Sequence, residues 1–126
     1  MAAAGKSIAI PAILKVGSGT LDQIGSYLKE ENFKNVVIYF GNGLIELFGM
    51  KVMDSLKEAD IEVLEYREID TVCIDDIVEM AFTLPGKVQT IISIGGGKVI
   101  DAGKYAAFLR GLPFISVPTS SSSDGF

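Results

Sequence analysis

Five short apolar runs recur along the chain, and a polar or helix-like stretch separates each from the next. Runs of this kind are typical of buried strands; they are Ile8–Val16, Val36–Phe40, Ile61–Tyr66, Thr90–Ile94 and Phe114–Val117. The second run shows no alternation of apolar and polar positions, which favours a parallel strand covered on both faces. The third run alternates in part, so we expect it near an edge of the sheet.

Four helical segments fill the intervals between these strands. The first begins near Thr20, where Thr20 and Gln23 have the spacing of a capping box. The second covers residues 44–58 with an expected interruption at Gly49, and the third ends at Pro85. The fourth begins at three consecutive glycines and carries a strip of small residues for close packing on the sheet: Val99, Ala102 and Ala106. This alternation predicts an α/β fold with a Rossmann-like, doubly wound, mainly parallel sheet.

The composition suits one folded domain. The chain has 126 residues, 48% of them hydrophobic, with 14 glycines. A net charge of −5 without a basic cluster argues against a nucleic-acid partner. The single cysteine, Cys73, excludes an intrachain disulfide, and no apolar run reaches the roughly 18 residues of a membrane span. We therefore expect a cytoplasmic protein that binds neither nucleic acid nor membrane.

Histidine is absent from the sequence, and this limits the chemistry. Histidine is the commonest general acid or base near neutral pH and the commonest transition-metal ligand. We therefore predict no catalytic residue and no metal ligand within these 126 residues. Three neighbouring acids, Asp75, Asp76 and Glu79, flank an apolar helical stripe and are interpreted as its solvated face.

The most informative segment is residues 90–126, where an apolar strand meets Gly95, Gly96 and Gly97 and then a helix. Such a turn brings bare backbone N–H groups and the positive end of a helix to one point, which suits a pyrophosphate. The turn matches neither the G-x-G-x-x-G fingerprint nor the phosphate loop G-x-x-x-x-G-K-[ST], because Ile100 and Lys98 stand where each requires glycine.

The run from Gly95 to Lys104, GGGKVIDAGK, does match the G-G-G-x-x-x-D-x-x-K signature of the iron-containing alcohol dehydrogenase and glycerol dehydrogenase superfamily. The segment Val117 to Gly125, VPTSSSSDG, resembles the second motif of that superfamily, and its Asp-Gly ending is most similar to the glycerol-1-phosphate dehydrogenase branch. A weaker similarity at residues 10–19 extends the resemblance over essentially the whole chain. The implied fold is that of a dehydroquinate synthase-like amino-terminal domain.

The resemblance also implies roles for single residues. It assigns Asp124 to the substrate hydroxyls, and Thr119, Ser122 and the residues Gly95, Gly96, Gly97 and Asp101 of the first motif to the cofactor. The predicted cofactor-binding set also includes Lys98, whose charge would balance that of the phosphates, and Gly41 and Ser120. Other interpretations stay open. The glycines suit any tight turn, Asp101 in the first turn of its helix suits the helix dipole, and Asp124 suits an Asp-Gly turn. Lys104 is suited equally to contact with the phosphates of a cofactor and to an ion pair with Asp101.

Cofactor choice depends on the segment after the second strand. Glycerol dehydrogenases carry there an acid that binds the ribose 2′-hydroxyl of NAD, whereas this chain reads Tyr39-Phe40-Gly41-Asn42-Gly43. The nearest acid in the sequence is Glu46. We therefore predict that NADP(H) is accepted within about tenfold of NAD(H). The alternative is that Asn42 or Glu46 still reads the 2′-hydroxyl.

Members of the resembled superfamily hold a divalent metal with an aspartate and two histidines from a second, helical domain, which is absent from this sequence. We therefore expect residues 1–126 to be the dinucleotide-binding domain of a longer two-domain enzyme, inactive alone. The whole enzyme would be a homo-oligomer that uses NAD or NADP and zinc, nickel or iron to transfer hydride between the nicotinamide and the alcohol or ketone group of a polyol or polyol phosphate. The alternatives are a dehydroquinate synthase-like enzyme and a stand-alone nucleotide-binding module without catalysis.

Overall fold

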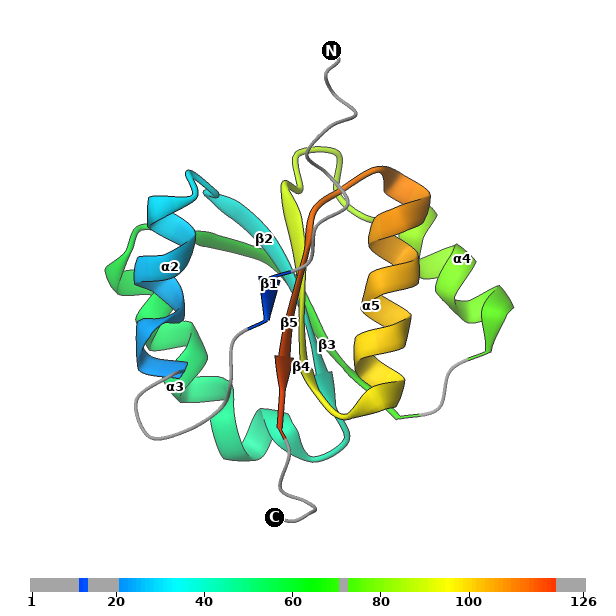
Figure 1. The fold of residues 1–126 in the computed structure, drawn as a ribbon, viewed down its shortest axis with the longest axis horizontal. Helices are drawn as coiled ribbons and strands as arrows, with labels where there is room; N and C mark the ends of the chain where they lie inside the picture. The colour runs from blue at the N-terminus through cyan, green and yellow to red at the C-terminus, as the bar shows by residue number, and fades with distance from the viewer. Residues whose placement is uncertain (1–11, 14–20, 71–72, 120–126) are drawn as a thin grey trace.

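A five-stranded parallel sheet forms the centre of the molecule (Figure 1). The structure, a computed structural model, describes residues 12–13, 21–70 and 73–119. The strand order is β1-β5-β4-β2-β3, and every neighbouring pair is parallel. The strands are β1 (Ala12–Ile13), β2 (Asn35–Gly41), β3 (Glu62–Ile69), β4 (Thr90–Gly95) and β5 (Phe114–Pro118). The rest of the predicted strand Ile8–Val16 lies outside the described residues.

Helices cover both faces of this sheet, as Figure 1 shows. The 3₁₀ helix η1 (Leu21–Gln23), α2 (Ile24–Glu30) and α3 (Leu44–Glu58) enclose one hydrophobic core, and α4 (Ile74–Phe82) and α5 (Gly97–Arg110) enclose the other. The doubly wound α/β fold predicted from the sequence is therefore confirmed.

Strand β2 explains why its apolar run does not alternate. Val37 and Tyr39 belong to the core under α4 and α5, whereas Val36, Ile38 and Phe40 belong to the core under α2 and α3. All five side chains are fully buried, because β2 lies inside the sheet and helices cover both of its faces. Successive residues of a strand point to opposite faces, so a strand covered on both faces needs apolar residues at every position.

Within the part of the chain that the structure describes, strand β3 pairs only with β2 and is an edge strand, as its partial alternation predicted. It runs to Ile69, three residues beyond the predicted end at Tyr66. The extension is polar and exposed at Arg67 and Glu68, and it pairs with the last residues of β2 up to Gly41. Backbone pairing, rather than apolar content, sets the end of this strand.

The predicted interruption of the second helix at Gly49 is wrong, because α3 runs without a break from Leu44 to Glu58. Gly49 is buried, and a Cβ at this position would lie 3.3 Å from the Cγ2 atom of Ile45. A glycine inside a helix costs about 1 kcal/mol relative to alanine, and the buried packing of Val52 and Leu56 on the same helix offsets that cost. Thr20 of the predicted capping box lies outside the described residues, and Gln23 makes no capping bond to α2.

Candidate cofactor site

The glycine turn joins β4 to α5 at the carboxyl edge of the sheet. Gly95 has a φ of +147°, a conformation that residues with a side chain rarely adopt. A Cβ at Gly95 would lie 2.6 Å from the Cγ1 atom of Val99 and 3.1 Å from the backbone N and Cα of Gly41. The structure therefore requires glycine at position 95 for the turn itself.

Gly96 and Gly97 have different surroundings from Gly95. Both are exposed, and a Cβ at either position would meet no atom within 4 Å. Gly96 is the N-cap residue of α5, and no side chain of the described residues caps this helix end. The first N–H groups of a helix have no partner within the helix and carry the positive end of its dipole. Gly96 and Gly97 therefore leave the first N–H groups of α5 accessible to an anion. A tight turn alone would not require glycine at these two exposed positions.

Thr119 and Gly41 flank the turn from the two neighbouring strands. The backbone N–H of Thr119, just after β5, donates a hydrogen bond to the carbonyl of Gly95 at 3.1 Å. On the other side, a Cβ at Gly41, the last residue of β2, would lie 3.5 Å from the Cα of Gly95. The structure thus brings together three of the predicted cofactor positions. Ser120, Ser122 and Asp124 lie outside the described residues, so their roles stay predictions.

Lys98 and Asp101 follow the turn on the exposed side of α5. Lys98 lies in the first helical turn, where the dipole disfavours a cation unless an anion is bound beside it. Asp101 is the fifth residue of α5, so the predicted position in the first turn is wrong. The dipole acts mainly within the first turn, and this weakens the capping interpretation of Asp101. Among the described residues, the alternative ion pair between Asp101 and Lys104 is not formed.

Close packing fixes α5 on the sheet. Val99, Ala102 and Ala106 are buried, as the strip of small residues predicted. Gly103 is needed too, although no sequence pattern indicated it: a Cβ there would overlap the Oγ of Ser93 and lie 2.8 Å from Cε1 of Phe114. The hydroxyl of Ser93 donates to the carbonyl of Val99 at 2.8 Å. These contacts hold the first turns of α5 beside the end of β4.

A carboxylate that the sequence did not reveal stands at the same edge. Oε2 of Glu68, near the end of β3, accepts a hydrogen bond of 2.9 Å from the backbone N–H of Gly43. Gly43 is the N-cap of α3 and has a φ of +80°. The acid nearest to Gly41 in sequence was Glu46, but Glu68 comes from the neighbouring strand. The signal available in the sequence was the acidic continuation of a predicted edge strand.

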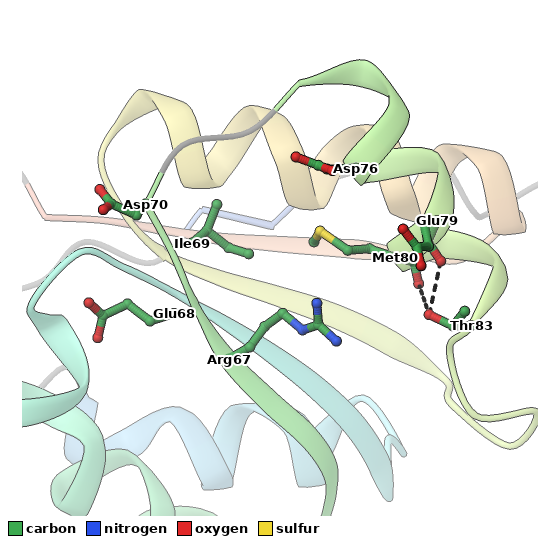
Figure 2. A pocket seen from close by; sticks show the side chains of 8 residues that line it. All are labelled: Arg67, Glu68, Ile69, Asp70, Asp76, Glu79, Met80 and Thr83. Carbon is green, nitrogen blue, oxygen red and sulfur yellow. Dashed lines mark hydrogen bonds between the residues drawn. The ribbon is translucent and has the colours of Figure 1, made fainter.

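Glu68 also borders a hollow of about 300 Å³ between β3 and α4 (Figure 2). In Figure 2, Glu68 and Arg67 point to opposite sides of β3. The other lining residues are Ile69, Asp70, Asp76, Glu79, Met80 and Thr83.

Within the described residues no group of three or more His, Cys, Asp or Glu side chains is arranged to hold a metal ion. Asp75, Asp76 and Glu79 are exposed, which confirms the solvated helix face.

Comparison with known proteins fits this geometry. Residues 15–126 match the iron-containing alcohol dehydrogenase family, and the chain belongs to that family. It is 33% identical over 119 residues to a glycerol-1-phosphate dehydrogenase (NAD(P)+) of Thermofilum pendens, covering 93% of this chain and 33% of the relative. It is 37% identical over 122 residues to the enzyme of that name from Saccharolobus islandicus, covering 94% of this chain and 34% of the relative. The chain therefore spans about one third of the length of these relatives.

Solved structures share the fold of this chain. A glycerol dehydrogenase from Schizosaccharomyces pombe superposes with a TM-score of 0.66 at 22% identity, covering 88% of this chain and 28% of the other. The second structure is the H277A mutant of an archaeal halo-thermophilic alcohol dehydrogenase from a Red Sea brine pool. It superposes with a TM-score of 0.66 at 26% identity, covering 82% of this chain and 26% of the other. No helix in the described part of this chain is long and apolar enough to cross a membrane.

Proposed function

We propose that this chain is the NAD(P)-binding domain of a metal-dependent dehydrogenase that acts on a polyol or polyol phosphate. The observation that carries the proposal is the open, uncapped start of α5 at Gly96 and Gly97, set between Gly41 and Thr119 at the carboxyl edge of a parallel sheet. Open α/β sheets bind ligands at this edge. The family membership and the glycerol-1-phosphate dehydrogenase relatives support the class of substrate.

The residues of this edge fit a dinucleotide. The pyrophosphate would lie on the N–H groups at the start of α5, where Gly96 and Gly97 leave room and Lys98 adds a positive charge. The adenosine would extend towards the end of β2 at Gly41, the strand beside the glycine turn. The nicotinamide would then lie towards β5, near Asp101 and Thr119, with Ser120 and Ser122 in the following segment.

In this proposal the residues of the chain bind and orient, and the reacting groups come from elsewhere. When bound, the nicotinamide gives or takes hydride and a divalent metal polarises the alcohol or ketone oxygen. We infer that zinc, nickel or iron is held by protein outside these 126 residues, and that Asp124 contacts the substrate hydroxyls. The described residues alone would fix the cofactor without turning over substrate. We expect the whole enzyme to be a cytoplasmic homo-oligomer.

Replacement of Gly96 with valine tests the cofactor site. A valine at this exposed position meets no atom of the protein within 4 Å at its Cβ and has an ordinary extended backbone, with φ −89° and ψ −164°. The fold should therefore survive, while the side chain blocks the approach of a pyrophosphate to the N–H groups. Calorimetric titration of the chain with NADH should show weak binding in the wild type and none in the variant.

Gly86→Val is the matched control, because Gly86 is also exposed with open space around its Cβ position but lies between α4 and β4, away from the turn. This variant should bind NADH like the wild type. Equal affinity in all three proteins would overturn the assignment of the glycine turn. Circular dichroism melting curves establish that both variants remain folded.

A further inference from the structure

The loop after β2 lacks a carboxylate of its own. In open α/β dinucleotide sites, an acid at the end of the strand beside the glycine turn binds the adenosine ribose and repels the extra phosphate of NADP. Here that strand is β2, since it lies beside β4 in the sheet. It ends in Gly41-Asn42-Gly43, which carries no charge.

Glu68 places a carboxylate against this uncharged loop. The register pairs Phe40 with Glu68 and Gly41 with Ile69, so the last residues of β3 run beside the last residues of β2. The hydrogen bond from Gly43 to Oε2 fixes one carboxylate oxygen at the loop backbone. The other oxygen, Oε1, has no hydrogen-bond partner among the described residues, and the side chain is exposed. An exposed acceptor is thus held where the adenosine half of a dinucleotide would lie.

No cation of the neighbouring strand cancels this charge. Arg67 is the adjacent residue, and an arginine beside the ribose accommodates the 2′-phosphate of NADP. Its guanidinium is instead bound to Glu65, with Nε and Nη2 at 3.1 and 2.8 Å from Oε2. Figure 2 shows it on the side of β3 opposite to Glu68. Arg67 therefore does not neutralise the carboxylate of Glu68 at the loop.

We propose that Glu68 determines cofactor specificity: its carboxylate accepts hydrogen bonds from the adenosine ribose and disfavours NADP(H). The proposal rests on the function proposed above. The prediction that NADP(H) is accepted within about tenfold of NAD(H) stays a prediction. It assumed that no acid stands at this loop, whereas the present proposal places Glu68 there. The structure supplies the acid from β3 instead of β2.

Glu68→Gln is the direct test. Glutamine keeps an oxygen that accepts the Gly43 N–H, so the loop should remain in place, but the negative charge is lost. Dissociation constants for NADH and NADPH are measured on the full-length protein that contains this chain. The affinity for NADPH relative to NADH should rise about tenfold, as expected for the removal of a like charge from a partly exposed site.

Glu62→Gln is the control, because Glu62 starts the same strand at the opposite edge of the sheet and faces Lys87 at 3.4 Å. This control changes the net charge by the same amount as Glu68→Gln and should leave the ratio of the NADPH and NADH affinities unaltered. A second measurement compares 5′-AMP with adenosine 2′,5′-bisphosphate, which differ only in the phosphate on the adenosine ribose. The same tenfold shift with these fragments locates the effect at that ribose.

The outcomes separate the two proposals. If both cofactors bind but Glu68→Gln leaves both ratios unchanged, or Glu62→Gln shifts them equally, the role of Glu68 is wrong while the cofactor site stands. If neither cofactor binds the wild-type protein, the proposed function itself falls, and the role of Glu68 with it. Equal melting temperatures of Glu68→Gln and wild type exclude a purely structural explanation for a shifted ratio.

Discussion

Glycines lie on both sides of the β4–α5 junction, but those on the inner side are buried and tightly packed, whereas those on the outer side are exposed. On the inner side, Gly95 and Gly103 are buried, and a Cβ at either would collide with Val99, Ser93 or Phe114. On the outer side, Gly96 and Gly97 are exposed with open space around them. The glycine run therefore combines a position where close packing requires glycine with two positions where packing does not, and these two are the ones at which the proposed cofactor would approach the backbone. Substitutions at these positions should separate stability from binding.

Gly95→Ala should show the largest loss of stability at the junction. The substitution forces a residue with a Cβ into a φ of +147° and sets that Cβ against the backbone of Gly41, which has no side chain that can rotate away. Strain of this kind costs about 1–3 kcal/mol, and we expect a loss near the upper end, about 3 kcal/mol. Urea unfolding of the isolated chain measures it.

Gly97→Ala serves as the comparison for Gly95→Ala. Gly97 is the first residue of α5 and has open space, and alanine is favoured over glycine inside helices by about 1 kcal/mol. The variant should match or exceed the wild type in its free energy of unfolding. A loss at Gly97 as large as that at Gly95 would refute the distinction between an inner and an outer side.

Gly103→Ala should cost less, about 2 kcal/mol, because its new methyl group meets side chains. Overpacking of a core typically costs about 1–3 kcal/mol, and the gain in helix propensity offsets part of it. Removal of the Ser93 hydroxyl in the double variant Ser93→Ala, Gly103→Ala should restore about 1 kcal/mol, measured as the coupling in a double-mutant cycle. Strict additivity would mean that Gly103 does not contact Ser93 as described.

The fold could be predicted from the sequence where a single strand or helix carries the signal. Val36–Phe40 is buried on both faces, so its apolar run alone identified it as a covered parallel strand. The strip of Val99, Ala102 and Ala106 likewise follows from the geometry of one helix. Both features depend on local periodicity, which needs no knowledge of the partner strands.

Prediction from the sequence failed where a residue's position or role depends on contact with a segment that is distant in the sequence. Glu68 went unnoticed because β3 was expected to end at Tyr66, and its polar extension exists only through pairing with β2. The need for glycine at position 103 depends on Ser93 and Phe114, from two other strands. Asp101 was placed in the first helical turn, but α5 already begins at Gly97, so Asp101 is its fifth residue. The errors at Glu68 and Gly103 thus concern positions that tertiary contacts decide, whereas the error at Asp101 concerns the start of one helix.

Tyr39→Phe should change the free energy of unfolding least at neutral pH. Tyr39 belongs to the same core as Val99, on the inner side of the junction. Tyr39 is fully buried under α4 and α5, and its hydroxyl has no hydrogen-bond partner among the described residues. An unsatisfied buried polar group costs about 1–3 kcal/mol. Loss of the hydroxyl should therefore stabilise the chain by about 1 kcal/mol, measured by urea unfolding at pH 7. A loss of stability of that size would show that the hydroxyl has a partner.

The pH dependence of this difference gives a second measurement. Burial, reinforced by Glu65 and opposed by Arg67, raises the pKa of Tyr39 to about 12 from its ordinary value of 10.0. The unfolded chain therefore loses this proton at a lower pH than the folded chain, so wild-type stability falls as the pH rises from about 10 towards 12. Tyr39→Phe lacks this loss, and its advantage over the wild type should grow across that range. Tyr27, whose pKa is raised by burial and by Glu31, is present in both proteins and cancels in the comparison.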